Sequence, residues 1–127
     1  MSKVRRAVVA VILLGVLAVP ATAYAEASIY KRLNIGNGTV YSTSSIYKWY
    51  RASQWTNVSS SSCSVTARIQ SRSTSTATWY TRASVTVSAG SGAGCSTSYP
   101  STQYWRLALA PSVWGLGSAE GVLNIYN

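Results

Sequence analysis

The chain has 127 residues, enough for one domain, and it contains 11 basic residues, 2 acidic residues and no histidine, which gives a formal net charge of +9. A chain without histidine lacks the commonest general base and the commonest metal ligand, and two carboxylates can hardly form a paired-acid site. These counts argue against an enzyme and give no indication of a bound metal or cofactor.

The first 25 residues have the layout of a secretory signal peptide. Three positive charges in residues 3–6 precede an apolar stretch over residues 7–19, and Ala23-Tyr24-Ala25 is a small-x-small cleavage pattern. The apolar stretch is too short to span a bilayer, which takes about 20 residues. We therefore expect cleavage after Ala25 and a secreted, extracellular domain of residues 26–127 without a transmembrane segment. Its eight basic and two acidic residues give a side-chain charge of +6.

Export also predicts the state of the two cysteines. In an oxidising compartment, Cys63 and Cys95 most simply form one disulfide. Their spacing matches neither a CxxC redox motif nor a zinc site, so the sequence favours a structural bridge.

Strands are expected along the whole mature chain, because it is rich in Thr, Val, Trp and Tyr and poor in Glu, Lys and Leu. The first expected strand covers residues 28–35. The Asn37-Gly38 dipeptide then predicts a turn, from which residues 39–41 would pair back as a hairpin. Residues 46–51 are the next candidate strand, and residues 54–62 are polar enough to form a loop.

Alternation of apolar and polar residues marks three further strands, over residues 63–69, 79–89 and 105–109. It places Trp79 and Trp105 on the core side. A Gly-rich loop is expected over 90–99 and an irregular segment over 111–117, before a closing strand over 121–126. Six or seven short strands with turns about every ten residues predict an all-β fold, a small antiparallel β-sandwich or barrel.

The same alternation defines a candidate binding surface. It turns two Tyr-x-Arg triplets outward, and two further arginines occupy the polar face of their own strand. These six residues are Tyr80, Arg82, Tyr104, Arg106, Arg68 and Arg72. Arginine binds phosphate and carboxylate groups, and Tyr and Trp rings stack on sugars or lie at membrane interfaces. The six residues would equally suit an ordinary solvated sheet face.

Charge and aromatic content together favour a secreted, non-enzymatic module that binds an anionic cell-envelope polymer, polysaccharide or membrane surface. The alternative is a bacteriocin-like antimicrobial protein that acts on the envelope of competing cells. Export argues against nucleic acid as the partner, and the sequence contains no recognisable nucleic-acid motif. A protein partner is a further hypothesis that no sequence feature singles out.

Overall fold

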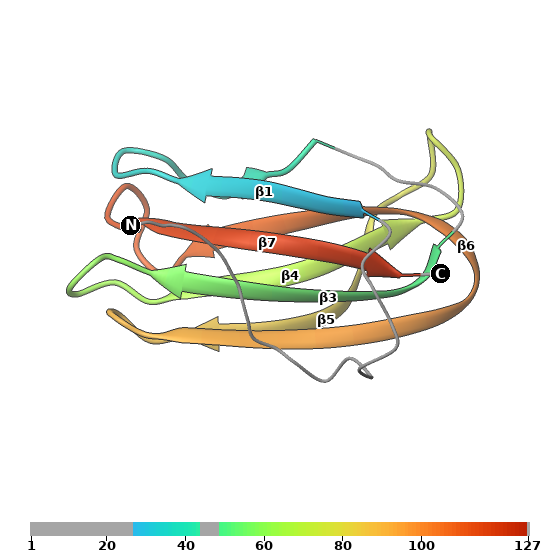
Figure 1. Ribbon diagram of the computed structural model, residues 1–127. Coiled ribbons are helices and arrows are strands. Elements are labelled where there is room, and N and C mark those ends of the chain that lie inside the picture. Colours follow the sequence, from blue (N-terminus) through green and yellow to red (C-terminus); the bar gives the residue numbers. More distant parts are fainter. Residues whose placement is uncertain (1–26, 44–48, 127) are drawn as a thin grey trace.

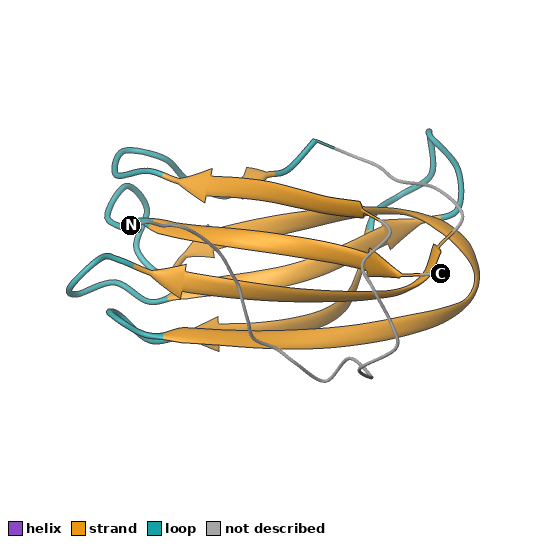
Figure 2. Cartoon of the chain, in the orientation of Figure 1, coloured by secondary structure: helices purple, strands orange, loops and turns teal. Residues whose placement is uncertain are grey.

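The computed structural model describes residues 27–43 and 49–126, so the expected signal peptide and the start of the candidate strand at 46–51 lie outside the described residues. The described chain consists of strands and loops (Figure 2). The strands are β1 (Ala27–Leu33), β2 (Val40–Tyr41), β3 (Trp49–Val58), β4 (Val65–Arg72), β5 (Tyr80–Val87), β6 (Gly92–Pro111) and β7 (Ala119–Tyr126). Every pairing between them is antiparallel, which confirms the predicted all-β class.

Strand β6 connects two layers of the fold. The strand order is β1-β7-β3-β6-β4-β5, and β2 also pairs with β6. The first part of the 20-residue β6 pairs with β3, and its last part pairs with β4 and β2. Figure 1 shows β6 curving around one end of the molecule from one layer to the other. The result is a β-sandwich with a first sheet (β1, β7, β3 and the start of β6) and a second sheet (β2, the end of β6, β4 and β5).

The bend in β6 lies where its alternating burial is interrupted, at the three exposed residues 100–102. Pro100 has no N–H to donate and therefore suits a position where ladder pairing stops. The register with β3 shifts at the same point, from the pair Arg51 and Ser98 to the pair Trp49 and Gln103. Alternation resumes beyond the bend and turns Trp105 and Leu107 inward.

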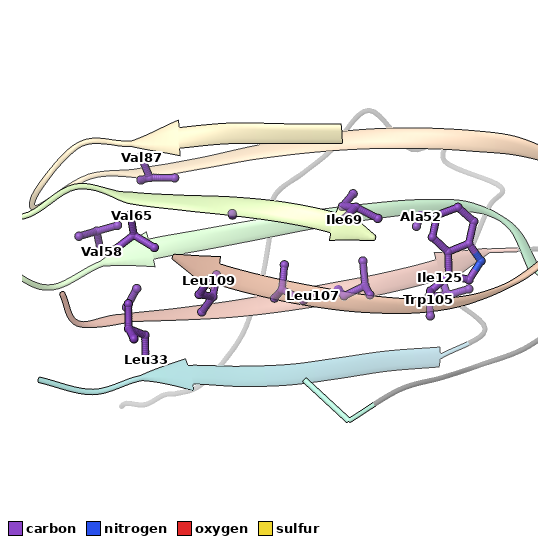
Figure 3. Close-up of a cluster of buried hydrophobic side chains, with 13 residues drawn as sticks. Leu33, Ala52, Val58, Val65, Ile69, Val87, Trp105, Leu107, Leu109 and Ile125 are labelled. Atoms are coloured by element: carbon purple, nitrogen blue, oxygen red, sulfur yellow. The ribbon is translucent and has the colours of Figure 1, made fainter. Parts of the chain in front are cut away.

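The core lies between the two sheets and is made of inward-facing residues from both (Figure 3). Leu33, Ile69, Leu107 and Leu123 are fully buried in it, and so is Trp105, as predicted. Burial of such side chains contributes roughly 1.5–3 kcal/mol each relative to exposure. The strands and core residues that the structure describes lie between Ala27 and Tyr126, so a chain that begins at Glu26 carries the described fold.

Three of the predicted local elements are wrong. Strand β2 pairs with β6 and does not fold back on β1 as a hairpin. Residues 54–58 are the second half of β3, and residues 92–99 are the first half of β6, although both segments were expected to be loops. These two segments pair with each other, so each polar run is held in the sheet by the other.

Trp55 explains why a Gly-rich segment forms part of a strand. Its indole lies across Gly92 and Gly94 of β6, where an added Cβ would stand 3.1 Å and 3.0 Å from ring atoms. Trp55 Nε1 also donates a hydrogen bond to Asn57 Oδ1 at 3.1 Å, which holds the ring along its own strand. Glycine weakens a strand because it has no side chain to pack, and an aromatic ring from the neighbouring strand compensates for that loss.

The expected disulfide is not formed, since Cys63 and Cys95 are both free thiols. Cys63 is buried before β4, where its Sγ lies 3.4 Å from Ser112 Oγ. Cys95 pairs in register with Gln54 of β3, whose Nε2 donates to the Cys95 sulfur at 3.4 Å. The hydrogen bond with Ser112 lowers the pKa of Cys63, whereas burial raises the pKa of Cys95.

We expect the Gly94→Ala variant to unfold at a lower temperature and urea concentration than the parent chain. A Cβ at this position would lie 2.5 Å from the backbone oxygen of Gln54, so the two strands must separate locally. Overpacking of this kind costs about 1–3 kcal/mol. The matched control is Ser96→Ala, at the next position on the same exposed side of β6. Equal midpoints for the two variants would show that the glycine is not required.

Candidate functional site: an arginine-rich sheet face

The strand register brings four of the six predicted residues onto one surface. On β4, residues 66, 68, 70 and 72 alternate with buried core residues and so face outward. In the pairing of β4 with β6, Gln70 lies opposite Arg106 and Arg72 lies opposite Tyr104. Arg68 occupies the same face, opposite Ala108. The outer face of the second sheet therefore carries Arg68, Arg72, Tyr104 and Arg106.

Two aromatic residues outside the six predicted from the sequence join this face. The guanidinium carbon of Arg106 lies 4.0 Å from the ring centroid of Tyr41 and 4.3 Å from that of Trp79. The guanidinium carbon of Arg72 lies 4.2 Å from the ring centroid of Trp79. These four residues alternate as ring, cation, ring and cation, and we call them the arginine–aromatic cluster. Each contact falls within the cation–π range of about 6 Å.

Hydrogen bonds to uncharged groups fix the two arginines. Arg106 Nε donates to Gln70 Oε1 at 2.7 Å, across the strand pair. Arg72 Nη1 lies 3.5 Å from the carbonyl oxygen of Ala77 in the β4–β5 connection, a long contact. Arg72 Nε is buried without a hydrogen-bond partner among the described residues. The cluster is thus held by ring stacking and amide contacts, and neither guanidinium is neutralised by these partners.

The electrostatics of the cluster favour an anion. Burial lowers the pKa of Arg106 below its ordinary value, and the positive charge of Arg72 lowers it further. Among the described residues, the ion pair that forms joins Arg32 to Glu120 at 2.7 Å, on the first sheet and away from the cluster. An anionic group near Arg72 and Arg106 would offset part of their mutual repulsion, and it could accept hydrogen bonds from a guanidinium group.

Arg82 does not belong to this surface, contrary to the outward position that alternation predicts. The β4–β5 register shifts between Ile69 and Gln70, so Gln70 lies opposite Thr81 and Ile69 opposite Ala83. Arg82 is the extra residue of this β-bulge. Its Nε donates to Oγ of the buried Ser71 at 2.8 Å, and its guanidinium lies 4.2 Å from the ring centroid of Tyr99.

Tyr80 and Trp79 also depart from the predicted arrangement near this bulge. Tyr80 is exposed, but its ring lies 5.3 Å from the guanidinium carbon of Arg82 and takes no part in the cluster. Trp79 precedes the bulge, and the extra residue reverses the side of the sheet on which the earlier side chains lie. The core position predicted for Trp79 is therefore wrong, and its ring lies on the outer face. The sequence contains one indication of the bulge. Thr81 is polar, although it occupies one of the alternate positions at which the predicted strand has its apolar residues.

Within residues 27–43 and 49–126, no group of three or more His, Cys, Asp or Glu side chains is placed to hold a metal ion. A search of the same part of the chain finds no helix of the length and apolarity needed to cross a membrane.

Comparison with known proteins adds little to this picture. No family model matches the chain, and no curated protein matches its sequence. Among solved structures, the chain is similar to one from the naturally occurring empty particles, or top component, of cowpea mosaic virus, at 11% identity and a TM-score of 0.36. The match covers 84% of this chain and 79% of that chain. A likeness at this TM-score carries no argument about function.

We expect Arg82→Ala to lower the free energy of unfolding by about 1–3 kcal/mol, because it removes a hydrogen bond to the buried Ser71 hydroxyl and the packing over Tyr99. Urea denaturation measures the effect. Arg68→Ala, on the outer face, is the control, and its effect should stay within about 0.5 kcal/mol. An Arg82→Ala variant as stable as the control would return Arg82 to the list of surface residues available for binding.

Proposed function

We propose that this protein is exported, loses residues 1–25, and binds an anionic polymer of a cell envelope through the outer face of its second sheet, without catalysing a reaction. The observation that carries the proposal is the arginine–aromatic cluster, in which Arg72 and Arg106 are stacked on aromatic rings and hydrogen-bonded to uncharged groups. Arginines held in this way keep their charge for an external ligand.

The chemistry of the surface supports an anion with several repeated groups. The guanidinium fork matches the geometry of phosphate and carboxylate, to which it can donate two parallel hydrogen bonds. Arg68 and Arg72 are four residues apart on one side of β4, a separation of about 13 Å at 3.3 Å per residue. Arg106 lies on the neighbouring strand, opposite Gln70. A linear polymer with charged groups along its length could contact all three arginines, whereas a small anion could not.

Three features of the sequence support an envelope as the source of that polymer. The N-terminal segment is typical of secreted proteins, the mature chain has a side-chain charge of +6, and its aromatic residues are exclusively Trp and Tyr. The absence of histidine and the presence of only two acidic residues in the whole sequence support a non-catalytic role.

The alternative function, a bacteriocin-like antimicrobial protein, would use the same cationic surface on the envelope of a competing cell. Binding alone does not separate the two functions, but growth inhibition does. A protein that binds walls and leaves growth unaffected is the binding module proposed here.

The test is sedimentation of residues 26–127 with purified Gram-positive cell walls. We expect Arg106→Ala to weaken binding about tenfold at low salt, which corresponds to the loss of about one charge-assisted hydrogen bond. The matched control is Arg51→Ala, which removes the same charge from the first sheet, where Arg51 lies 5.6 Å from the ring centroid of Tyr126. This control should change binding less than about twofold, as only screened long-range attraction is lost.

Two outcomes would contradict the proposal. Equal losses for the two variants would mean that binding depends on total charge and not on the cluster. Absence of pelleting at low salt, where attraction is strongest, would exclude an anionic wall ligand altogether. Circular dichroism must show that both variants are folded. Walls stripped of their phosphate polymers identify the ligand class, since retained binding points to carboxylates of the remaining wall.

A further inference from the structure

Four large apolar side chains are exposed together at the end of the sandwich opposite to Arg72. They are Ile35, 64% exposed, Val113, 50%, Trp114, 76%, and Leu116, 50%. We call this group the apolar tip. It lies on two loops, residues 34–39 between β1 and β2 and residues 112–118 between β6 and β7. Figure 1 shows both loops at the same end of the molecule.

The two loops of the apolar tip form one unit. Gly36 N donates to Gly115 O at 2.9 Å, and Gly115 N donates to Asn37 O at 3.0 Å. The indole of Trp114 lies against Gly38, where an added Cβ would stand 2.6 Å from Nε1. The loops are therefore fastened to each other, and the exposed side chains are held in place by bonded backbone.

These backbone hydrogen bonds also lower the cost of removing the loops from water. A further bond within each loop joins Asn37 N to Asn34 O at 3.1 Å and Leu116 N to Val113 O at 3.1 Å. An unpaired backbone N–H or C=O is costly in an apolar medium, and paired groups avoid part of this cost.

The end that carries the apolar tip has no charged side chain in its loops. Four loops meet there, residues 34–39, 59–64, 88–91 and 112–118 (Figure 1). Their sequences contain Ser, Gly, Asn, Thr, Ala, Cys and the apolar residues, but no Asp, Glu, Lys or Arg. The charged residues begin behind the loops, with Lys31 and Arg32 on β1 and with Glu120 on β7 paired to Arg32.

We propose that the apolar tip inserts into the interfacial region of a phospholipid bilayer that carries negatively charged headgroups. Tryptophan prefers this region because its ring is apolar and its N–H is polar. The positive charge of the rest of the protein, which is +6 over residues 26–127, attracts it to an anionic bilayer. The uncharged loops then enter without the penalty of burying a charge. A second copy of the chain fits this end less well, since both copies carry the same net positive charge and repel each other.

This inference goes beyond the proposed function and uses a different part of the molecule. The arginine–aromatic cluster lies on the second sheet toward the end where Arg72 pairs with Tyr104, whereas the loop 112–118 follows the other end of that sheet, where Val65 pairs with Pro111. The two surfaces can therefore be disabled separately.

The test uses residues 26–127 and vesicles of phosphatidylglycerol mixed with phosphatidylcholine. The parent protein should pellet with these vesicles, and brominated lipids should quench part of its tryptophan fluorescence. Trp114→Ser combined with Leu116→Ser should weaken pelleting at least tenfold, and its fold should be intact because both side chains are exposed. The single variant Trp114→Phe should lose the quenched part of the signal, whereas Trp55→Phe, at an exposed position on the first sheet, should retain it.

The inference is wrong if the parent protein does not pellet with the mixed vesicles, if the double variant binds as well as the parent, or if brominated lipids do not quench Trp114 in bound protein. Arg106→Ala distinguishes this proposal from the proposed function. A loss of wall binding with retained insertion supports the tip as a separate surface. The proposal of a separate surface would be overturned if brominated lipids quenched the tryptophan fluorescence of Arg106→Ala as little as that of Trp114→Phe.

Discussion

Strand β6 runs through both sheets, and this continuity fixes the two layers of the fold relative to each other. A single 20-residue strand pairs with β3 before its bend and with β4 after it, so the register of one sheet limits the register of the other. Buried polar side chains at the bend also need hydrogen-bond partners. Gln103 accepts a hydrogen bond from Ser71 through Oε1 at 3.0 Å and donates through Nε2 to the Thr102 carbonyl at 2.9 Å. With Gln103 fixed on the inner side, Tyr104 and Arg106 fall on the outer face and opposite their partners on β4.

The outer face of the second sheet concentrates positive charge, and no acidic side chain of the described residues pairs with it. Two guanidinium groups within 4.3 Å of one Trp79 ring repel each other. Burial is the main cause of the lowered pKa of Arg106, and the positive charge of Arg72 adds to it. Each stacking contact returns about 0.5–2 kcal/mol, depending on how far the cation is removed from water. The hydrogen bond between Arg106 and Gln70 adds about 1.5–3 kcal/mol, as is typical of bonds to charged groups. These contributions hold the arginines in place while leaving their charge uncompensated.

Alternation predicts much of this fold, and its failures have local physical causes. It correctly places Trp105, Leu107 and Leu109 in the core, because residues 104–111 form an uninterrupted strand. It fails at Trp79, because the bulge at Arg82 reverses the faces for everything before it. It also misses the strand over 92–99, whose stability comes from Trp55 on another strand and is invisible in a window of local sequence. Tyr41 enters the cluster through the pairing of β2 with β6, a contact between residues far apart in the chain.

The arginine-rich sheet face and the apolar tip differ in how their contacts depend on salt concentration. Attraction between the outer face of the second sheet and an anionic polymer falls with ionic strength, since the Debye length is about 8 Å at physiological salt. Burial of the apolar tip depends on apolar area and is not weakened by screening. Because the two surfaces lie at different positions along the strands, a molecule bound to a polymer by its arginines keeps Trp114 and its neighbours exposed. Polymer binding would then raise the local concentration of the tip near the membrane that the polymer surrounds. The affinity of the tip for that membrane would thereby increase without any change of conformation.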